Sequence, residues 1–472
     1  MTIEEYEALR RELVEANSNL HGLVLREEET RLDAILSELK RELRNDCGGS
    51  VPYDLPVLTD ARLTGSRLYA FCRRMPKGAD LHVHDMALLP AEELIDLLLT
   101  RPEFCIDPES YVLSRAEVGA PLPAGVLRFS EALQSGVITR EALLQNWTML
   151  GAATSGKPIW DYFECLFSRH SVLSDDTEFA EAYYDRAFRY CCRNGIQHVE
   201  IHVMLTGDME ESEAYLRAVR AAYYRVKQDE PQLTVRMIGA GMKADSDRLE
   251  TSRRCFLNTT YGQELVKDES DPAHPQDFVI GFDLVNEEDG NRTLHDFAPM
   301  LLKVKERYPA LRFYIHGGES LSADNENLID AYLLGVSRVG HGLNLYRYPD
   351  LHARYVKAEI CLEVCPISNQ VLGYARDLRT HPATEYLRTG AAIALCSDDP
   401  AYMERSTLTD DFFAAVVAWD LSLTDLKQLA INSLQYSGLD PVTKTEALKA
   451  FDRAWRSFVR TVLAENGGEA RS

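Results

Sequence analysis

The sequence predicts an α/β protein: a (β/α)8 TIM barrel with an N-terminal helical extension and a long insertion after the first strand. Eight short apolar runs follow one another along the chain, and most of them precede a helical pattern such as Ser212–Lys227 or Leu294–Arg307. Strand–helix alternation is typical of a parallel sheet, and eight units over about 340 residues fit a barrel with insertions better than a doubly wound sheet. No G-x-G-x-x-G or Walker pattern follows any run, which argues against a dinucleotide or nucleoside-triphosphate site. The predicted strands are Ala79–His84, Gln197–Val203, Thr234–Ala240, Phe278–Val285, Arg312–His316, Ser337–Gly340, Ile360–Val364 and Ala392–Cys396.

The chain is predicted to divide into a helical arm, residues 1–61, and a barrel domain, residues 62–472. The arm is rich in Glu, Leu, Arg and Ala, and Leu32, Ile35, Leu36 and Leu39 fall at helical spacing. Two interpretations of this arm stay open: amphipathic helices that pack on the body, or an arm that joins two subunits.

The insertion covers about residues 86–195, where a single helix would suffice to connect two strands. It holds a loop from Gly119 to Gly125, helical pieces around 141–150 and an aromatic group that includes Trp160 and Phe163. An insertion on the C-terminal face of a barrel is where a lid would lie. The alternative is that these aromatic residues form an ordinary core cluster.

Composition and charge narrow the class of protein. The apolar share of 45% is ordinary for a globular protein, and no run of 18 apolar residues predicts a membrane span. A formal net charge of −23 argues against nucleic acid and anionic lipid as partners, because these need a basic surface. The acidic N-terminus lacks the basic-then-apolar order of a signal peptide, and the ten cysteines are scattered without a zinc-finger or redox spacing. These features predict a cytoplasmic protein with free thiols.

The first predicted strand carries the first sign of chemistry, because His82 and His84 stand two apart at its C-terminal end. Residues i and i+2 of a strand point to the same face, so both imidazoles can reach one point. Neutral imidazole is a good ligand for zinc and similar ions. Alone, such a pair is as easily explained by solvated or hydrogen-bonded histidines.

Other strand ends supply further candidate residues: His316 followed by Gly-Gly-Glu319, then His341, then Asp398-Asp399. A barrel gathers the C-terminal ends of its strands at one face, where its active site lies. Three histidines and one carboxylate make a nitrogen and oxygen set suited to zinc, although iron or cobalt would also fit. These candidate ligands are His82, His84, His316 and Asp398. Such an ion lowers the pKa of a bound water from about 15.7 towards 7. His341 and Asp398 can hold and deprotonate that water, and Glu319 is free to carry a proton if burial keeps its pKa high.

The candidate residues belong to longer motifs: Met75-Pro-Lys with Leu81-His82-Val83-His84, His316-Gly-Gly-Glu319, Arg338-Val-Gly-His341-Gly, Leu362-Glu-Val-Cys-Pro-Ile-Ser-Asn369 and Ser397-Asp398-Asp399-Pro400. With these motifs the chain resembles the adenosine deaminase family from Met75 to Met403. Three details, which are His84-Asp85, Cys365-Pro-Ile-Ser-Asn-Gln-Val-Leu372 and Gly281-Phe-Asp-Leu-Val285, are similar to the adenosine deaminase-related growth factor (adenosine deaminase 2) branch.

The resemblance implies one zinc ion per subunit and hydrolytic deamination of adenosine, and of 2′-deoxyadenosine, to inosine and ammonia. It implies that Glu319 protonates purine N1, and that His341 and Asp398 orient and activate the attacking water. It also implies that Asp399 contacts N7 and that Asp85 contacts a ribose hydroxyl. From its place next to Asp398, Asp399 is expected to point into the pocket as a hydrogen-bond acceptor. The lid segment that covers the sugar would comprise Trp160, Phe163 and Glu164.

The chain also departs from the family pattern. Asn286 stands where the family usually has Gly, at a strand end whose backbone N–H meets purine N3; Asn keeps that N–H and tolerates unusual φ. Met242-Lys243 replaces the His-Arg pair that is usual in the growth-factor branch, which puts one ribose or base contact in doubt. Residues 101–150 contain only Cys105, so the branch's cysteine-bridged receptor-binding insertion, and with it a secreted growth-factor role, does not carry over. The arm resembles the branch's dimerising helices, which predicts a homodimer.

Two alternative functions stay open. The first keeps the chemistry and changes the substrate to AMP, N6-methyladenosine or free adenine. A 5′-phosphate would need two or more cations near the sugar, and only Lys243 and Arg169 are candidates. The second is a catalytically weak nucleoside-binding or signalling protein, against which the complete set of site residues argues. Cytidine-type deamination is set aside because its Pro-Cys-x-x-Cys signature is absent.

Overall fold

The barrel predicted from the sequence is present in the computed structural model, which describes residues 2–16, 23–49, 51, 61–174, 176–204, 209–244, 278–307, 309 and 311–467. Eight strands form one sheet in the order β1-β5-β6-β7-β8-β9-β10-β11, and every neighbouring pair in that order is parallel. The strands are buried along nearly their whole length, which explains why each one is a continuous apolar run in the sequence. Their bounds are β1 (Gly78–His84), β5 (Ile196–Val203), β6 (Thr234–Met242), β7 (Val279–Val285), β8 (Arg312–Gly317), β9 (Arg338–His341), β10 (Cys361–Val364) and β11 (Ile393–Leu395).

The first and last strands meet just beyond β11, and this closes the barrel. Asp398 forms a parallel bridge with Val83 of β1. The Asp398 N–H donates to the carbonyl of His82 (2.9 Å), and the N–H of His84 donates to the carbonyl of Asp398 (3.0 Å). The closure therefore joins, through the backbone, three of the residues that the sequence predicts to hold a metal.

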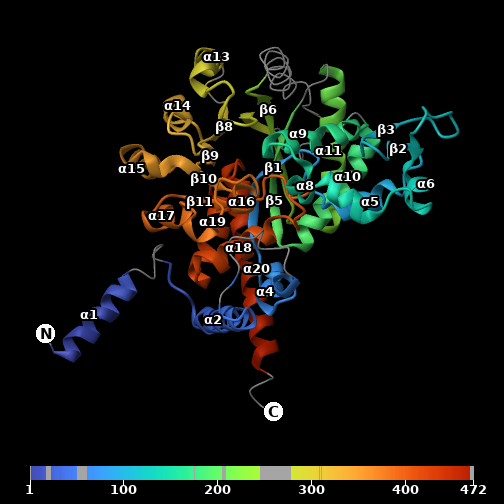
Figure 1. The fold of residues 1–472 in the computed structure, drawn as a ribbon. Helices are drawn as coiled ribbons and strands as arrows, with labels where there is room; N and C mark the ends of the chain where they lie inside the picture. The colour runs from blue at the N-terminus through green and yellow to red at the C-terminus, as the bar shows by residue number, and fades with distance from the viewer. Residues whose placement is uncertain are drawn as a thin grey trace.

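Helices surround the strands, with α13, α14 and α15 on one side and α10 and α11 on the other (Figure 1). The two helices predicted at Ser212–Lys227 and Leu294–Arg307 are present as α11 and α13. The helices of the barrel are α10 (Thr177–Arg193), α11 (Met209–Asp229), α13 (Leu294–Arg307), α14 (Asn327–Leu334), α15 (Pro349–Ala358), α16 (Pro366–Val371), α17 (Ala383–Arg388), α18 (Leu408–Trp419), α19 (Leu423–Gln435) and α20 (Pro441–Gly467). Among the described residues, no helix is both long enough and apolar enough to cross a bilayer.

The N-terminal helices behave differently from one another. Of the residues predicted at helical spacing in α2 (Glu27–Asp46), Leu32, Leu36 and Leu39 are buried and Ile35 is partly buried. Glu29 of the same helix forms a buried ion pair with Lys427 of α19 (Oε1–Nζ 2.5 Å). Glu29 also accepts a hydrogen bond from Trp455 of α20 (2.9 Å). By contrast, α1 (Ile3–Ala16) stands apart from the rest of the ribbon (Figure 1). Helices α3 (Ala61–Thr64) and α4 (Arg67–Arg74) lead into β1.

The insertion between β1 and β5 combines helices with a small antiparallel sheet of order β3-β2-β4. Its strands have two or three residues each, too few to give an alternating pattern, and the sequence did not predict them. The helical pieces expected around residues 141–150 are present as α7 and a 3-10 turn at Met149–Gly151. The elements are α5 (Ala91–Leu98), β2 (Phe104–Ile106), β3 (Leu113–Arg115), β4 (Leu127–Arg128), α6 (Phe129–Gln134), α7 (Arg140–Trp147), α8 (Ala152–Ser155) and α9 (Ile159–His170).

Candidate active site

Three histidines and an aspartate converge at the C-terminal ends of β1, β8 and β11. The Nε2 atoms of His84 and His316 lie 3.3 Å apart. Oδ1 of Asp398 lies 3.2 Å from Nε2 of His84 and 3.6 Å from Nε2 of His82. Tetrahedral ligands at 2.0–2.1 Å from one ion are about 3.3 Å from each other. The spacing of these four side chains therefore suits a shared metal ion.

Carboxylates behind the histidines fix which nitrogen faces the site. Nδ1 of His82 lies 2.8 Å from Glu363, and Nδ1 of His316 lies 2.6 Å from Asp283. Each Nδ1–H can donate to its carboxylate, which leaves the lone pair on Nε2. Nε2 of His82 is buried and has no hydrogen-bond partner. A bare, buried lone pair that faces other ligand atoms is what a metal site presents, so the residues fit a divalent ion.

His341, the last residue of β9, adjoins the same cluster. Candidate ligand atoms of His341, His82, His316 and Asp398 all lie within 4.8 Å of one another. Nδ1 of His341 lies 3.5 Å from Oε1 of Glu319. Burial lowers the pKa of His341 to about 4, so this imidazole is neutral near pH 7 and can accept a proton. His341 and Asp398 have φ of 63° and 60°, in the left-handed region that few non-glycine residues adopt.

Glu319, just past the end of β8, lies beside the cluster as a buried acid. It is 3% exposed, and its Oε1 has no hydrogen-bond partner. Burial, reinforced by the negative charges of Asp398 and Glu288, raises the pKa of Glu319 well above its ordinary value. A carboxylic acid that keeps its proton at neutral pH can act as a proton donor.

Asp399 is also buried, at 3% exposed, and its Oδ1 has no hydrogen-bond partner. Its candidate ligand atom lies within 4.8 Å of those of His84 and Asp398. Burial and the charge of Asp398 raise the pKa of Asp399 well above its ordinary value. A protonated Asp399 can donate a hydrogen bond, whereas the sequence-based interpretation expected it to accept one.

Asp85, next to His84, is held by two tyrosines from the surrounding helices. The hydroxyls of Tyr184 in α10 and Tyr215 in α11 both donate to Oδ1 of Asp85. Burial raises the pKa of Asp85. The tyrosines fix the direction of this carboxyl, and the sequence analysis missed both of them because they lie in amphipathic helices far from any motif.

Helix α9 carries the residues predicted to form a lid, and it is tied to the barrel on two sides. The indole N–H of Trp160 donates to the hydroxyl of Tyr374 (2.8 Å), which follows α16. The side-chain amide of Asn286, at the end of β7, donates to Glu164 (3.2 Å). Asn286 has a positive φ of 93°, a conformation that asparagine adopts more readily than most residues. Phe163 is 4% exposed within an apolar cluster, so for this residue the core interpretation also holds.

Sequence reasoning missed a buried layer of charged side chains beneath the histidines. His202 of β5 shares the carboxylate of Asp283 with His316, at 2.7 Å, and its ring centroid lies 4.5 Å from that of His82. Arg338 of β9 joins Glu363 to Glu200, at 2.5 Å to each. The available signal was a charged residue inside an otherwise apolar strand. The members of this layer are Glu200, His202, Asp283, Arg338 and Glu363.

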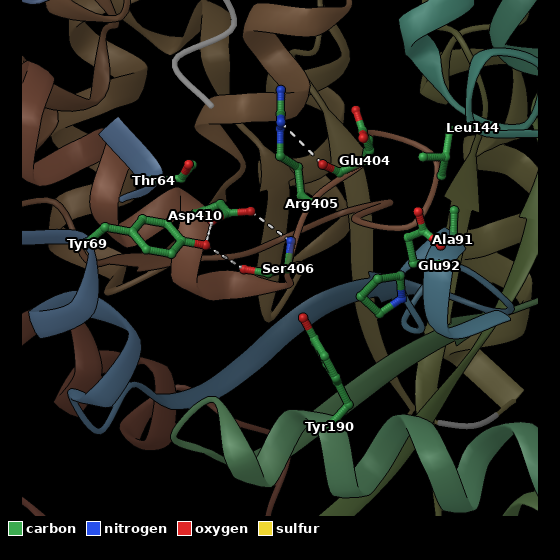
Figure 2. Close-up of a pocket in the computed structure, with 11 residues that line it drawn as sticks. Thr64, Tyr69, Ala91, Glu92, Leu144, Tyr190, Glu404, Arg405, Ser406 and Asp410 are labelled. Carbon is green, nitrogen blue, oxygen red and sulfur yellow. Dashed lines mark hydrogen bonds between the residues drawn. The ribbon is translucent and has the colours of Figure 1, made fainter. Parts of the chain in front are cut away.

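A separate cavity of about 230 Å³ lies between α4, the start of α5, α10 and the segment that follows Asp399. Figure 2 shows the hydroxyl of Tyr69 between Asp410 and Ser406 on one wall, with Tyr190 opposite. The residues that line it are distinct from the histidine and aspartate cluster, so this cavity is not the site described above.

Comparison with models of protein families shows to which family the chain belongs. A model of the family described as adenosine deaminase matches residues 154–454, more than half of the chain. The chain belongs to the adenosine deaminase family. Family members are hydrolytic deaminases, so this member is an enzyme of that class.

Relatives and solved structures agree with this family membership. This adenosine deaminase family member is 29% identical to an adenosine deaminase of Phlebotomus duboscqi over 456 residues, 92% of this chain and 86% of the relative. It is 28% identical to an adenosine deaminase 2 of Dictyostelium discoideum over 84% of this chain and 76% of the relative. The N6-methyl-AMP deaminase of Arabidopsis thaliana has a similar fold, with a TM-score of 0.59 and 15% identity, over 82% of this chain and 99% of that one.

Proposed function

We propose that this enzyme hydrolyses adenosine, and 2′-deoxyadenosine, to inosine and ammonia with the help of one zinc ion. Water supplies the oxygen that replaces the 6-amino group, and the amino group leaves as ammonia. The observation that carries the proposal is the convergence of His82, His84, His316 and Asp398 beside a buried acid, Glu319.

The four converging side chains would hold the ion. When bound, a divalent ion would supply Lewis-acid activation of water. Zinc is preferred because three imidazoles and one carboxylate suit its ligand chemistry. The carboxylates Glu363 and Asp283 contribute by holding His82 and His316 with Nε2 towards the site.

Glu319 and His341 supply the proton transfers in this proposal. Glu319 donates its proton to N1 of the purine, which makes C6 more electrophilic. His341, neutral because its pKa is about 4, orients the attacking water, and Asp398 accepts a hydrogen bond from it. The raised pKa of Glu319 supports this assignment, because an ionised carboxylate could not donate.

The remaining predicted contacts surround the base and sugar. Asp399, with its raised pKa, would donate to N7, and the backbone N–H of Asn286 would meet N3. Asp85, aligned by two tyrosines, would accept from a ribose hydroxyl. Helix α9, with Trp160, Phe163 and Glu164, would cover the sugar. The ties from α9 to β7 and to Tyr374 support a closed position of this helix.

The charges at the lid favour a nucleoside over a nucleotide. Glu287 is close enough to Asp289 and Glu164 for their charges to raise its pKa, after the larger effect of burial. A 5′-phosphate would be repelled by such a group of carboxylates. Lys243, a candidate phosphate ligand in the sequence, is instead fully buried against Glu288, and Arg169 donates to the carbonyl of Asn146. The second candidate is N6-methyl-AMP deamination, the activity for which the structural neighbour is named. It ranks second because these contacts leave neither cation available for a phosphate.

A substrate panel tests the proposal. Ammonia release is measured with adenosine, 2′-deoxyadenosine, adenine, AMP, N6-methyladenosine and N6-methyl-AMP, with metal analysis on the same sample. We expect the highest kcat/KM with adenosine and about one zinc per chain. A clear preference for AMP or N6-methyl-AMP would overturn the choice of substrate, and turnover of none of them would favour a nucleoside-binding protein.

The exposed helix α1 supports a homodimer formed through the N-terminal arm, residues 1–61. Ile3, Tyr6 and Leu9 are 71%, 47% and 47% exposed and recur at a spacing of three, which places them near one face of the helix. Such a face is stabilised when a second helix covers it. Light scattering on the full chain and on a chain that lacks residues 2–16 tests this proposal. A monomeric full chain would refute it.

The thiols support a reducing compartment such as the cytoplasm. In the described part of the chain, the free thiols include Cys72, Cys105, Cys165, Cys191, Cys192, Cys361, Cys365 and Cys396. Disulfides are usual in small secreted domains and rare in cytosolic enzymes. Fractionation of the producing cell, with the product assayed in medium and lysate, tests this location.

A further inference from the structure

The Lys243–Glu288 pair is a buried ion pair that the proposed chemistry does not use. Lys243 follows β6 directly and is 0% exposed, while Glu288 follows β7 and is 4% exposed. Nζ of Lys243 lies 3.0 Å from Oε1 of Glu288. Burying two charges is costly, and a buried pair is weak evidence for stability. The role of the pair therefore lies in the groups that it holds in place.

Both members of the pair contact the backbone of one loop. Nζ of Lys243 also donates to the carbonyl of His316 (3.1 Å). Oε2 of Glu288 accepts from the N–H of Gly318 (3.1 Å). These two backbone groups lie three residues and one residue before Glu319, so the ion pair holds the loop at the residues that lead into the proposed proton donor.

Neighbouring asparagines further restrict the movement of Glu288 and of the loop. Oε2 of Glu288 also accepts from the side-chain amides of Asn325 and Asn327, at 2.7 and 2.9 Å. Gly318 has φ 75°, and a Cβ there would lie 2.6 Å from Oδ1 of Asn344, so the loop has no room to shift on that side. Oε1 of Glu319 has no hydrogen-bond partner of its own, so no hydrogen bond to this atom anchors the acid. The hydrogen bonds to the backbone of the loop are therefore important for the position of Glu319.

We propose that Lys243 and Glu288 are positioning residues that clamp the His316–Glu319 loop and thereby hold Glu319 at the purine ring. This inference rests on the proposed function, because it assigns the pair to the same proton transfer. Misplacement of a catalytic group by about 1 Å costs up to about 100-fold in rate.

The test uses three variants of the full-length, metal-loaded enzyme: Glu288→Gln, Lys243→Met and the double variant Lys243→Met/Glu288→Leu. The double variant leaves no unpaired charge in the core, so it keeps the test valid if a single variant fails to fold. We expect kcat for adenosine to fall about 10- to 100-fold, with KM within about threefold of wild type, because the lost interaction serves the transition state. Lys243→Arg, which keeps the charge and the donors, should recover part of kcat.

A second readout does not depend on turnover. Amide hydrogen exchange of the peptide that spans residues 316–320 should be faster in the variants than in wild type, because the N–H of Gly318 loses its partner. Zinc content should stay the same. If wild type deaminates no nucleoside, the proposed function fails, while the exchange rates still decide whether the clamp exists.

The chain offers a matched control. Glu29 and Lys427 form another buried Glu–Lys pair, between α2 and α19, away from the site. Glu29→Gln should lower the melting temperature, yet leave kcat and loop exchange unchanged. The proposal is overturned if the double variant folds and turns over adenosine at the wild-type rate, or if loop exchange is unchanged in it. A loss of kcat in Glu29→Gln equal to that in the clamp variants would also overturn it.

Discussion

Replacement of Glu319 by glutamine removes the transferable carboxyl proton and keeps the size and shape of the side chain. The side chain is 3% exposed and its Oε1 has no hydrogen-bond partner, so glutamine occupies the same space without breaking a contact of that atom. Its amide still donates a hydrogen bond but cannot transfer a proton. General acids contribute about 10²- to 10⁴-fold to rate, which corresponds to about 2.7 to 5.5 kcal/mol of activation free energy. We expect Glu319→Gln to lower kcat by that factor.

The assay separates chemistry from binding. Steady-state ammonia release gives kcat and KM, calorimetry with inosine gives ground-state binding, and elemental analysis gives the metal content. Inosine affinity and metal content should match wild type, because neither requires the proton of Glu319. Glu326→Gln, an exposed carboxyl seven residues along the chain, serves as the control and should behave as wild type. A rate for Glu319→Gln within about threefold of wild type would refute the assignment of Glu319 as the proton donor.

Three further predictions follow from the same geometry. Glu363→Gln should weaken metal affinity about 10- to 100-fold in a chelator competition, because it loosens the anchor of His82; unchanged affinity would contradict this. The kcat/KM of wild type should fall as pH rises through the raised pKa of Glu319, because the donor is active only while protonated; an alkaline limb that persists in Glu319→Gln would assign the titration to another group. Gly340→Ala places a Cβ 2.7 Å from Cε1 of His82 and should lower the free energy of unfolding by about 1–3 kcal/mol in a denaturant titration; an unchanged midpoint would show that His82 can move aside.

The barrel was predictable because its strands are buried on both faces. The run predicted as Thr234–Ala240 is β6, Thr234–Met242, and the one predicted as Phe278–Val285 is β7, Val279–Val285. Helices on the outside and side chains within the barrel leave no solvent face, so each strand is a continuous apolar segment. The small sheet in the insertion has no such signature, since strands of two or three residues are shorter than any periodicity.

The residues at the strand ends were predictable for a different reason. A barrel carries every strand's C-terminal end to one face, so His84 and His316, 232 positions apart, can be expected to meet once the fold is known. The sequence could not say which of the histidine nitrogens faces the site. That choice depends on Glu363 and Asp283, which belong to other strands and lie within apolar runs. Their partners are set by the tertiary fold rather than by spacing along the chain.

The N-terminal arm shows what hydrophobic periodicity alone cannot predict. The same helical pattern was compatible with packing on the body and with joining two subunits. In the structure α2 is anchored on the body through the Glu29–Lys427 ion pair, while Ile3, Tyr6 and Leu9 of α1 are exposed. The joining of two subunits through α1 stays a prediction. Amphipathic spacing shows that a face will be covered, but not which surface covers it.

The buried charged side chains beneath the site form one connected series of hydrogen-bonded pairs. Glu200 near the far end of the barrel binds Arg338, Arg338 binds Glu363, and Glu363 holds Nδ1 of His82. Breaking a buried pair leaves an uncompensated charge, so each member depends on the next, and the series is costly unless every group is satisfied. An apolar core of the same volume would be at least as stable, yet it could not fix the tautomer of His82. The barrel interior is therefore charged where apolar packing would suffice for folding, because orienting the imidazole requires a carboxylate that is itself held in place.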